Sequence, residues 1–299
     1  MTTSLDVPSA AAATPTSLVG DFRESVADVW AHRELLVQLA KRDIKLRYKQ
    51  SVMGFAWAIL MPLMVVFAGL VVRLAMAYVG GQPLSSSAMG GVVVKALPWA
   101  FFVGAVGFAS TTLVGNANLV SKVFFPREVL PLAALLTQSF DTLVGAAALT
   151  LVIPLMGARL SFALLWIVPL SALFFLLTTA ICLFLACSNL FFRDVKYLVQ
   201  VFLTFGIFFT PVFFDASMLG QRWGPLLMLN PIAPLLEGFR VAVMRGHNLL
   251  YPLQIVEKGK LVELWIPGSL LWSTACALVG VLLATATFRR LQYLFAEYI

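Results

Sequence analysis

Side chains able to perform catalysis are scarce in this chain of 299 residues. The two histidines, His32 and His247, lie far apart in the sequence, and the three cysteines all fall within apolar runs. Their spacing matches no metal site, and there is no H-E-x-x-H pair, nucleophile elbow or phosphate-binding glycine–lysine loop. The sequence therefore predicts no catalytic residue, no metal ligand and no cofactor site in this chain.

Charged side chains also occur inside long apolar runs, at Arg73, Lys95 and Asp141. Asp141 lies in LLTQSFDTLVG, near the middle of such a run. An intramembrane carboxylate can serve a proton relay, but a relay needs a second titratable group on a facing helix, and no obvious one is present. We favour a structural hydrogen bond between Asp141 and another helix, with the relay as the alternative.

The composition indicates which elements must position these residues. The chain is 61% hydrophobic and only 12% charged, whereas a soluble domain has about 25% charged residues. Lipid must therefore be the solvent for most of its surface, and we predict an all-α membrane protein. Six apolar runs approach the length that a membrane-spanning helix needs; they lie at 52–79, 92–115, 130–156, 162–190, 197–214 and 264–288.

Basic residues predict the orientation of these helices. They gather before the first run, between the second and third, between the fourth and fifth, and after the sixth. The positive-inside rule then places both termini in the cytoplasm. Because the basic residues border apolar runs, we interpret the net charge of +7 as topological and expect no nucleic-acid partner.

The N-terminal residues form two predicted segments. Residues 1–20 are rich in Ala, Ser, Thr and Pro, which is typical of a disordered tail. Within residues 21–50, Lys41, Lys45 and Lys49 are four residues apart, so a helix would carry a cationic stripe beside a mostly apolar one. We expect this amphipathic helix to lie in the membrane interface. Its basic residues are Lys41, Arg42, Lys45, Arg47 and Lys49.

The stretch between the fifth and sixth runs breaks the simple pattern. Its apolar halves are too short to cross a bilayer, and Asn230-Pro231 is a turn signal. Glu237 and Arg240 are three residues apart, close enough to pair on a helix. We predict a re-entrant helical hairpin at 216–245, with an ordinary extracellular loop as the alternative. Its marker residues are Asn230, Pro231, Pro234, Glu237 and Arg240.

Aromatic residues gather in FLTFGIFFTPVFF, residues 202–214. Such a cluster faces lipid or packs against other helices, or it lines a channel in which flat rings stack on sugar faces. The candidate channel-lining residues are Phe55, Trp57, Phe205, Phe208 and Phe209.

The segment NLVSKVFFPREVLP, between the second and third runs, is predicted to face the cytoplasm. It sets two phenylalanines, which we expect to be exposed, among charged residues. An apolar pair in a water-facing loop is a plausible contact for another protein. Because the chain has no recognisable energy source, a soluble motor is the expected partner. The candidate coupling residues within 118–130 are Lys122, Phe124, Phe125, Pro126, Arg127 and Glu128.

Four segments together resemble a known family. LLVQLAKRDIKLRYKQSVMGFAWAILMPL is similar to the start of the permease subunits of bacterial polysaccharide exporters of the type-two ABC class, which move O-antigen, teichoic acid or capsule. VSKVFFPREVLP, FFRDVKY and LNPIAPLLEGFR follow in the order that this family shows. The resemblance extends from Leu35 to the C-terminus.

The resemblance implies a homodimer of six-helix permeases in the bacterial inner membrane, with two cytoplasmic ATPase subunits that bind ATP and Mg. It implies an undecaprenyl-linked glycan as substrate. Residues 21–50 would be the interface helix, 118–130 the coupling helix and 216–245 the gate helices. The alternatives are a permease of the same class for a drug or lipid, and a membrane enzyme acting on lipid-linked sugars. The enzyme would need clustered polar or acidic residues at one membrane face, which the sequence does not offer.

Overall fold

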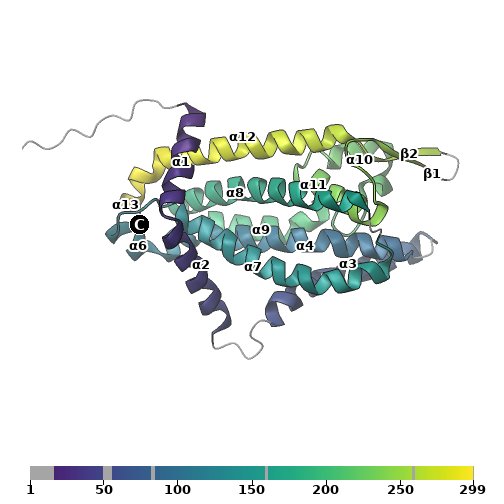
Figure 1. The fold of residues 1–299 in the computed structure, drawn as a ribbon, viewed down its shortest axis with the longest axis horizontal. Coiled ribbons are helices and arrows are strands. Elements are labelled where there is room, and N and C mark those ends of the chain that lie inside the picture. The colour runs from purple at the N-terminus through teal and green to yellow at the C-terminus, as the bar shows by residue number, and fades with distance from the viewer. Residues whose placement is uncertain (1–16, 50–55, 82–84, 159–160, 258–259, 299) are drawn as a thin grey trace, which may run out of the picture.

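The computed structural model describes residues 17–49, 56–81, 85–158, 161–257 and 260–298. Within them, five helices are long and apolar enough to cross a membrane, and they lie roughly along the long axis of the molecule (Figure 1). The chain is thus an α-helical membrane protein. The five helices are α3 (Ala56–Val79), α4 (Ser86–Ala109), α7 (Val129–Val152), α8 (Ile167–Phe191) and α12 (Pro267–Leu291). Short turns extend three of them: η1 (Ile153–Met156), η2 (Phe162–Trp166) and η6 (Gln292–Leu294).

The fifth predicted run forms a shorter helix. α9 (Val195–Gly206) continues only through the turn η3 (Ile207–Phe209) and does not reach spanning length. It ends there because Thr210 is extended (φ −132°, ψ 136°) before Pro211, and a residue that precedes proline disfavours the helical region. The described residues therefore hold one helix of spanning length fewer than the six predicted.

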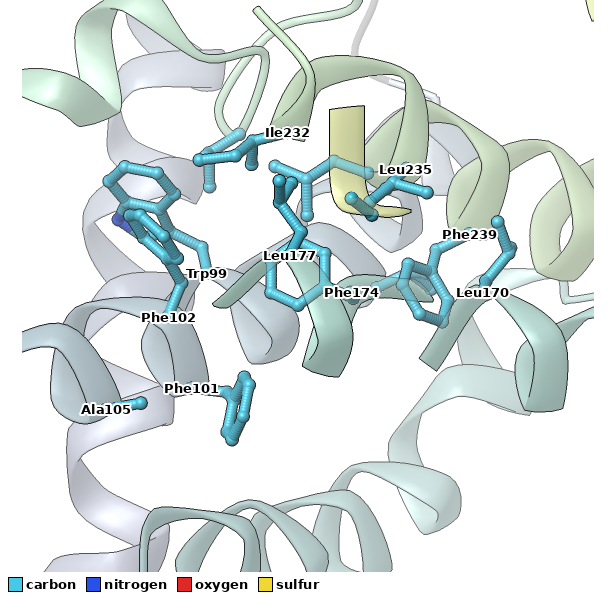
Figure 2. Packing of buried hydrophobic residues seen from close by; sticks show 14 of the residues in the cluster. Trp99, Phe101, Phe102, Ala105, Leu170, Phe174, Leu177, Ile232, Leu235 and Phe239 are labelled. Atoms are coloured by element: carbon cyan, nitrogen blue, oxygen red, sulfur yellow. The ribbon is translucent and has the colours of Figure 1, made fainter. Parts of the chain in front are cut away.

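α4 is the central helix of the bundle and packs against α3, α7, α8 and α11 (Ile232–Arg240). Aromatic side chains join three of these helices (Figure 2). The ring of Phe174 on α8 meets Phe102 on α4 and Phe239 on α11 edge-on, with centroids 6.4 Å apart in both pairs. Such large apolar side chains supply much of the packing energy of a core. A Cβ at Gly90 would lie 2.3 Å from Met244 Cε, so a larger residue at this position of α4 would require the Met244 side chain to move.

The N-terminal segment forms two helices where one was predicted. α1 (Leu18–Ala31) and α2 (Arg33–Tyr48) meet at His32, whose backbone leaves the helical conformation (φ −101°, ψ 22°). α1 packs on α12 and α2 packs on α7, and both lie across the long helices (Figure 1). Residues 18–20, predicted as part of a tail, belong to α1. Residues 1–16 of that tail lie outside the described residues.

The short elements gather at the two ends of the bundle. The terminal end carries α1, α2, α5 (Thr112–Gly115), α6 (Ala117–Lys122) and α13 (Phe295–Tyr298). The hairpin end, opposite to it in Figure 1, carries α10 (Gly220–Leu227) and the antiparallel strands β1 (Leu253–Glu257) and β2 (Lys260–Trp265). The β-hairpin was not predicted. Two further turns are η4 (Ala216–Leu219) and the π-turn η5 (Val241–Arg245).

The predicted hairpin at 216–245 consists of helical pieces joined at Asn230-Pro231. The Asn230 side chain accepts a hydrogen bond from the backbone N–H of Ile232 (3.1 Å) and donates to Thr210 Oγ1 (3.1 Å). The turn is therefore closed locally and tied to the end of α9. Pro234 is buried in α11.

Candidate functional site

The candidate coupling segment, residues 118–130, turns its two phenylalanines to opposite sides. After α6 the backbone becomes extended at Val123 (φ −122°, ψ 135°), and neighbouring side chains of an extended segment point in opposite directions. Phe124 is fully exposed, whereas Phe125 is 7% exposed and belongs to the apolar core with Leu39 and Phe288. The expectation that both phenylalanines are exposed is therefore wrong for Phe125.

The other candidate coupling residues divide in the same way. Lys122 is exposed beside Phe124 and Pro126 is half-buried. Arg127 donates a hydrogen bond to the backbone carbonyl of Gln292, and its guanidinium carbon lies 5.7 Å from the ring centroid of Phe295. The chain's own C-terminal segment thus holds Arg127, and Lys122 and Phe124 are the candidate coupling residues that remain exposed.

Glu128 lies inside the terminal end. It is 1% exposed, and its Oε1 has no hydrogen-bond partner among the described residues. Burial raises the pKa of the Glu128 carboxyl, although a hydrogen bond with Ser25 and the charge of Arg289 oppose this shift. Glu128 is therefore covered by its own chain, with Ser25 of α1 as a hydrogen-bond partner.

An acidic stripe on α1 binds the end of α12. Arg289 pairs with Glu24 (3.1 Å) and Asp28 (3.0 Å), and Arg290 pairs with Asp21 (3.3 Å). The three acids lie three and four residues apart, which places them on one face of a helix. Sequence reasoning missed these pairs, although this spacing was a usable signal.

The predicted interface residues take two roles. Lys41, Lys45 and Lys49 are exposed along α2. Arg42 instead pairs with Asp43 (2.8 Å) and donates a hydrogen bond to Asn116 Oδ1 (3.2 Å). The lysines thus remain available for a membrane surface or a partner, while Arg42 contacts the junction of α5 and α6.

Two residues at the end of α2 interact with the carboxylate of Asp141. Arg47 forms an ion pair with its carboxylate, and Tyr48 donates a hydrogen bond to Oδ1 (2.5 Å). The guanidinium of Arg47 also lies 5.3 Å from the ring centroid of Phe108 on α4. Burial, and next the hydrogen bond to Asp141, raise the pKa of Tyr48. The partner that sequence reasoning did not find is thus an arginine of α2.

Five charged side chains meet at the hairpin end, and we call them the buried charge cluster. Lys95 Nζ lies 3.0 Å from Asp215 Oδ1 and 3.3 Å from Glu237 Oε1. Lys95 is completely buried, and it also donates to the carbonyl of Phe214 (2.6 Å). All three of its donors are therefore used, which is the condition for keeping an ammonium group away from water. The cluster consists of Arg73, Lys95, Asp215, Glu237 and Arg240.

Two arginines complete the cluster. Arg240 Nε lies 2.6 Å from Glu237 Oε2, so the pair predicted from the spacing is confirmed, and Arg240 also contacts Asp215 (3.3 Å). Arg73 on α3 pairs with Asp215 (3.1 Å). Burial by itself raises the pKa of Asp215, but Lys95, Arg240 and Arg73 together hold it well below its usual range. The cluster ties α3 and α4 to the helical hairpin through ion pairs.

The candidate channel-lining aromatics lie on the surface of the chain. Trp57 on α3 and Phe205, Phe208 and Phe209 on α9 and η3 are exposed. Phe55 lies outside the described residues. On α9 the exposed apolar residues recur at helical spacing and form one continuous face; they include Leu198, Val201, Phe202 and Phe205.

These features are those of a multi-pass helical membrane protein in which ion pairs join the helices. The described residues contain no cluster of three or more potential metal ligands. The profile of the ABC-2 type transporter family matches residues 34–244, and the chain belongs to this family.

Curated relatives resemble the chain over most of its length. It is 30% identical over 252 residues to the O-antigen export system permease protein RfbA of Myxococcus xanthus, covering 82% of this chain and 94% of the relative. Two proteins of the same name from Klebsiella pneumoniae are 26% and 25% identical over 265 residues, covering 88% of this chain and 94% of each relative.

Proposed function

We propose that this chain is the transmembrane subunit of an ATP-driven exporter that moves a lipid-linked polysaccharide across the bacterial inner membrane. The observation that carries this proposal is the similarity to O-antigen export permeases over most of both chains. An O-antigen is the favoured cargo, and teichoic acid and capsule are related glycans of the same kind. In this proposal six segments cross the membrane, with α9 and the residues after it as the fifth.

A separate ATPase supplies the energy in this proposal. Two copies bind ATP and Mg in the cytoplasm and dock on the terminal end, where Phe124 projects fully into solvent and Lys122 is exposed beside it. The opposite burial of Phe125 supports this location, because it anchors the segment in the core of its own chain. Both termini then lie in the cytoplasm, as the basic residues of α2 favour.

A second copy of the chain forms the pathway. The apolar face of α9 and most of α3 are exposed in a single copy, and a homodimer would bring such faces together around a channel. Phe205, Phe208 and Phe209 would then lie near the glycan. The hairpin at 216–245 would enter the outer half of the membrane and close the pathway, with the buried charge cluster holding it to α3 and α4.

A second candidate function is the export of a drug or lipid. A cavity of about 550 Å³ lies between α4, α7 and α8, with mostly apolar side chains around it. Such a cavity suits a hydrocarbon ligand better than a glycan. Its lining includes Leu97, Phe101, Leu149, Phe174 and Phe175.

Deletion of the gene for this chain tests the proposal. We expect lipid-linked glycan to accumulate inside the deletion strain and surface glycan to disappear, with both restored by the intact chain. Normal surface glycan in the deletion strain would refute glycan export. Drug or lipid sensitivity with normal surface glycan would favour the second candidate.

A further inference from the structure

A second cavity, of about 560 Å³, lies between the C-terminal half of α4 and α9. It is near the terminal end, because α5 and α6 follow α4 directly in the chain. We call it the α4–α9 cavity. Its volume lies within the range of small-molecule sites, about 300–1,000 Å³. Its lining consists of Val103, Gly107, Ser110, Thr111, Lys196, Tyr197, Val199, Gln200, Leu203 and Thr204.

Three hydroxyl groups around this cavity already donate their hydrogens to backbone carbonyls. Ser110 donates to the carbonyl of Gly107 (3.0 Å), Thr111 donates to that of Phe108 (3.0 Å), and Thr204 donates to that of Gln200 (2.8 Å). A hydroxyl has a single hydrogen but two lone pairs. Toward a ligand these three oxygens therefore act as acceptors, and the ligand must supply the donors.

The other residues that line the cavity also suit a ligand that supplies hydrogen-bond donors. The Gln200 amide can donate and accept, and Lys196 Nζ, 4.8 Å from the ring centroid of Tyr197, can donate. Val103 and Leu203 provide apolar surface between the polar groups. A sugar ring has this combination, because hydroxyl groups around its edge both donate and accept while its C–H faces are apolar.

A phosphate group fits less well. Its oxygens accept hydrogen bonds, as do the three hydroxyl oxygens, so among the lining residues only Lys196, Gln200 and the Tyr197 hydroxyl could donate to it. Lys196 is the single cation among the lining residues, and one cation makes a weak anion site. The α4–α9 cavity therefore suits a sugar better than a phosphate.

We propose that the α4–α9 cavity is a carbohydrate subsite that holds a sugar unit of the glycan at the cytoplasmic end of the pathway. This inference rests on the proposed function and adds the location and chemistry of a first contact with the sugar. Thr204 and Gln200 accept from, or exchange hydrogen bonds with, the sugar hydroxyls, and Lys196 donates to a ring or hydroxyl oxygen.

A labelling experiment tests ligand binding directly. Val103→Cys places a thiol in the cavity without removing a polar group, in a chain where Cys276→Ser removes the partly exposed native thiol. The full chain, assembled with its ATPase in lipid nanodiscs, is labelled with a maleimide. The added probe is either the oligosaccharide released from the host's lipid-linked glycan or inorganic pyrophosphate. We expect the oligosaccharide to slow labelling and pyrophosphate to leave it unchanged.

Matched substitutions identify the contacts. Gln200→Leu together with Thr204→Val should raise the oligosaccharide concentration needed for half-protection by about tenfold, since each removes a hydrogen bond of typical strength. Thr274→Val is the control, because Thr274 makes the same 2.8 Å bond to a carbonyl of its own helix but does not line the cavity. Thermal unfolding and yield of each variant show whether it has folded.

The outcomes separate this inference from the proposed function. Protection by pyrophosphate and not by oligosaccharide, or by neither probe, overturns the sugar subsite. Unchanged half-protection in the folded double variant does so as well. Export itself is measured by complementing the deletion strain: if the intact chain restores surface glycan, the proposed function stands whether or not the cavity binds sugar.

Discussion

Arg47 of α2 and Asp141 of α7 form an ion pair although they lie 94 positions apart in the sequence. Tyr48 adds a hydrogen bond to the same carboxylate, so two consecutive residues attach α2 to a long helix of the bundle. Through Asp141, α2 is fixed to α7, whose first turn directly follows the segment with Phe124 and Phe125.

The first prediction concerns this pair. Asp141→Asn should lower the free energy of unfolding by about 1 kcal/mol, because the pair is partly exposed through Arg47, and it should leave export intact. Arg47→Met should have a similar effect, and the double variant should lose less than the sum of both. Thermal unfolding of all three measures the coupling. Additive losses would show that the two charges do not interact, and lost export in an assembled Asp141→Asn complex would favour the proton relay.

The second prediction concerns the buried charge cluster. Lys95→Met should lower the free energy of unfolding by about 3 to 5 kcal/mol, because Asp215 and Glu237 then lose a shared cation away from water. Lys45→Met on the exposed face of α2 is the matched control and should change it by less than about 0.5 kcal/mol. Equal unfolding temperatures for the two variants would contradict the structural role of Lys95.

The third prediction separates the two neighbouring phenylalanines. Phe125→Ala should lower the free energy of unfolding by about 3 to 5 kcal/mol, because it leaves a cavity in the core. Phe124→Ala should leave stability unchanged and reduce substrate-stimulated ATP hydrolysis and export, because its exposed ring is the proposed contact with the ATPase. Unchanged hydrolysis and export in the Phe124→Ala complex would remove Phe124 from that contact.

The fourth prediction follows from the raised pKa of Glu128. A carboxyl group with a raised pKa in the folded state binds its proton more tightly there than in the unfolded chain. Its contribution to stability is therefore present below the ordinary pKa of 4.5 and falls as the pH rises from there through the folded pKa. Glu128→Gln should remove this slope, which thermal unfolding across a pH series would detect. The exposed Glu34→Gln should retain it, and an unchanged slope in Glu128→Gln would exclude Glu128 as its origin.

Local patterns predicted much of the architecture. The scarcity of charge and the apolar runs predicted a helical membrane protein, and five of the runs appear as helices of spanning length. The spacing of Glu237 and Arg240 predicted their pair, because residues three apart on a helix are neighbours whatever surrounds them. The fifth run was overestimated because it included Pro211, which follows the end of the helix.

Contacts between distant segments could not be predicted in this way. Nothing local shows that Phe124 faces solvent while Phe125 enters the core, since the two residues are identical in type and adjacent. Lys95 needed partners because it lies in an apolar run, but their identity depended on how α4, α11 and the segment at Asp215 pack together.

The sequence by itself determined that lipid surrounds most of this protein. It also determined the approximate extent of the long helices and the family to which the chain is similar. These properties follow from hydropathy, charge and motif order, which neighbouring residues carry along the chain. Only the tertiary structure decided that Arg47 meets Asp141, that Arg289 meets Asp28, and that Lys95 joins two acids. Such pairs depend on packing between helices that are far apart in sequence, and packing is a property of the whole bundle.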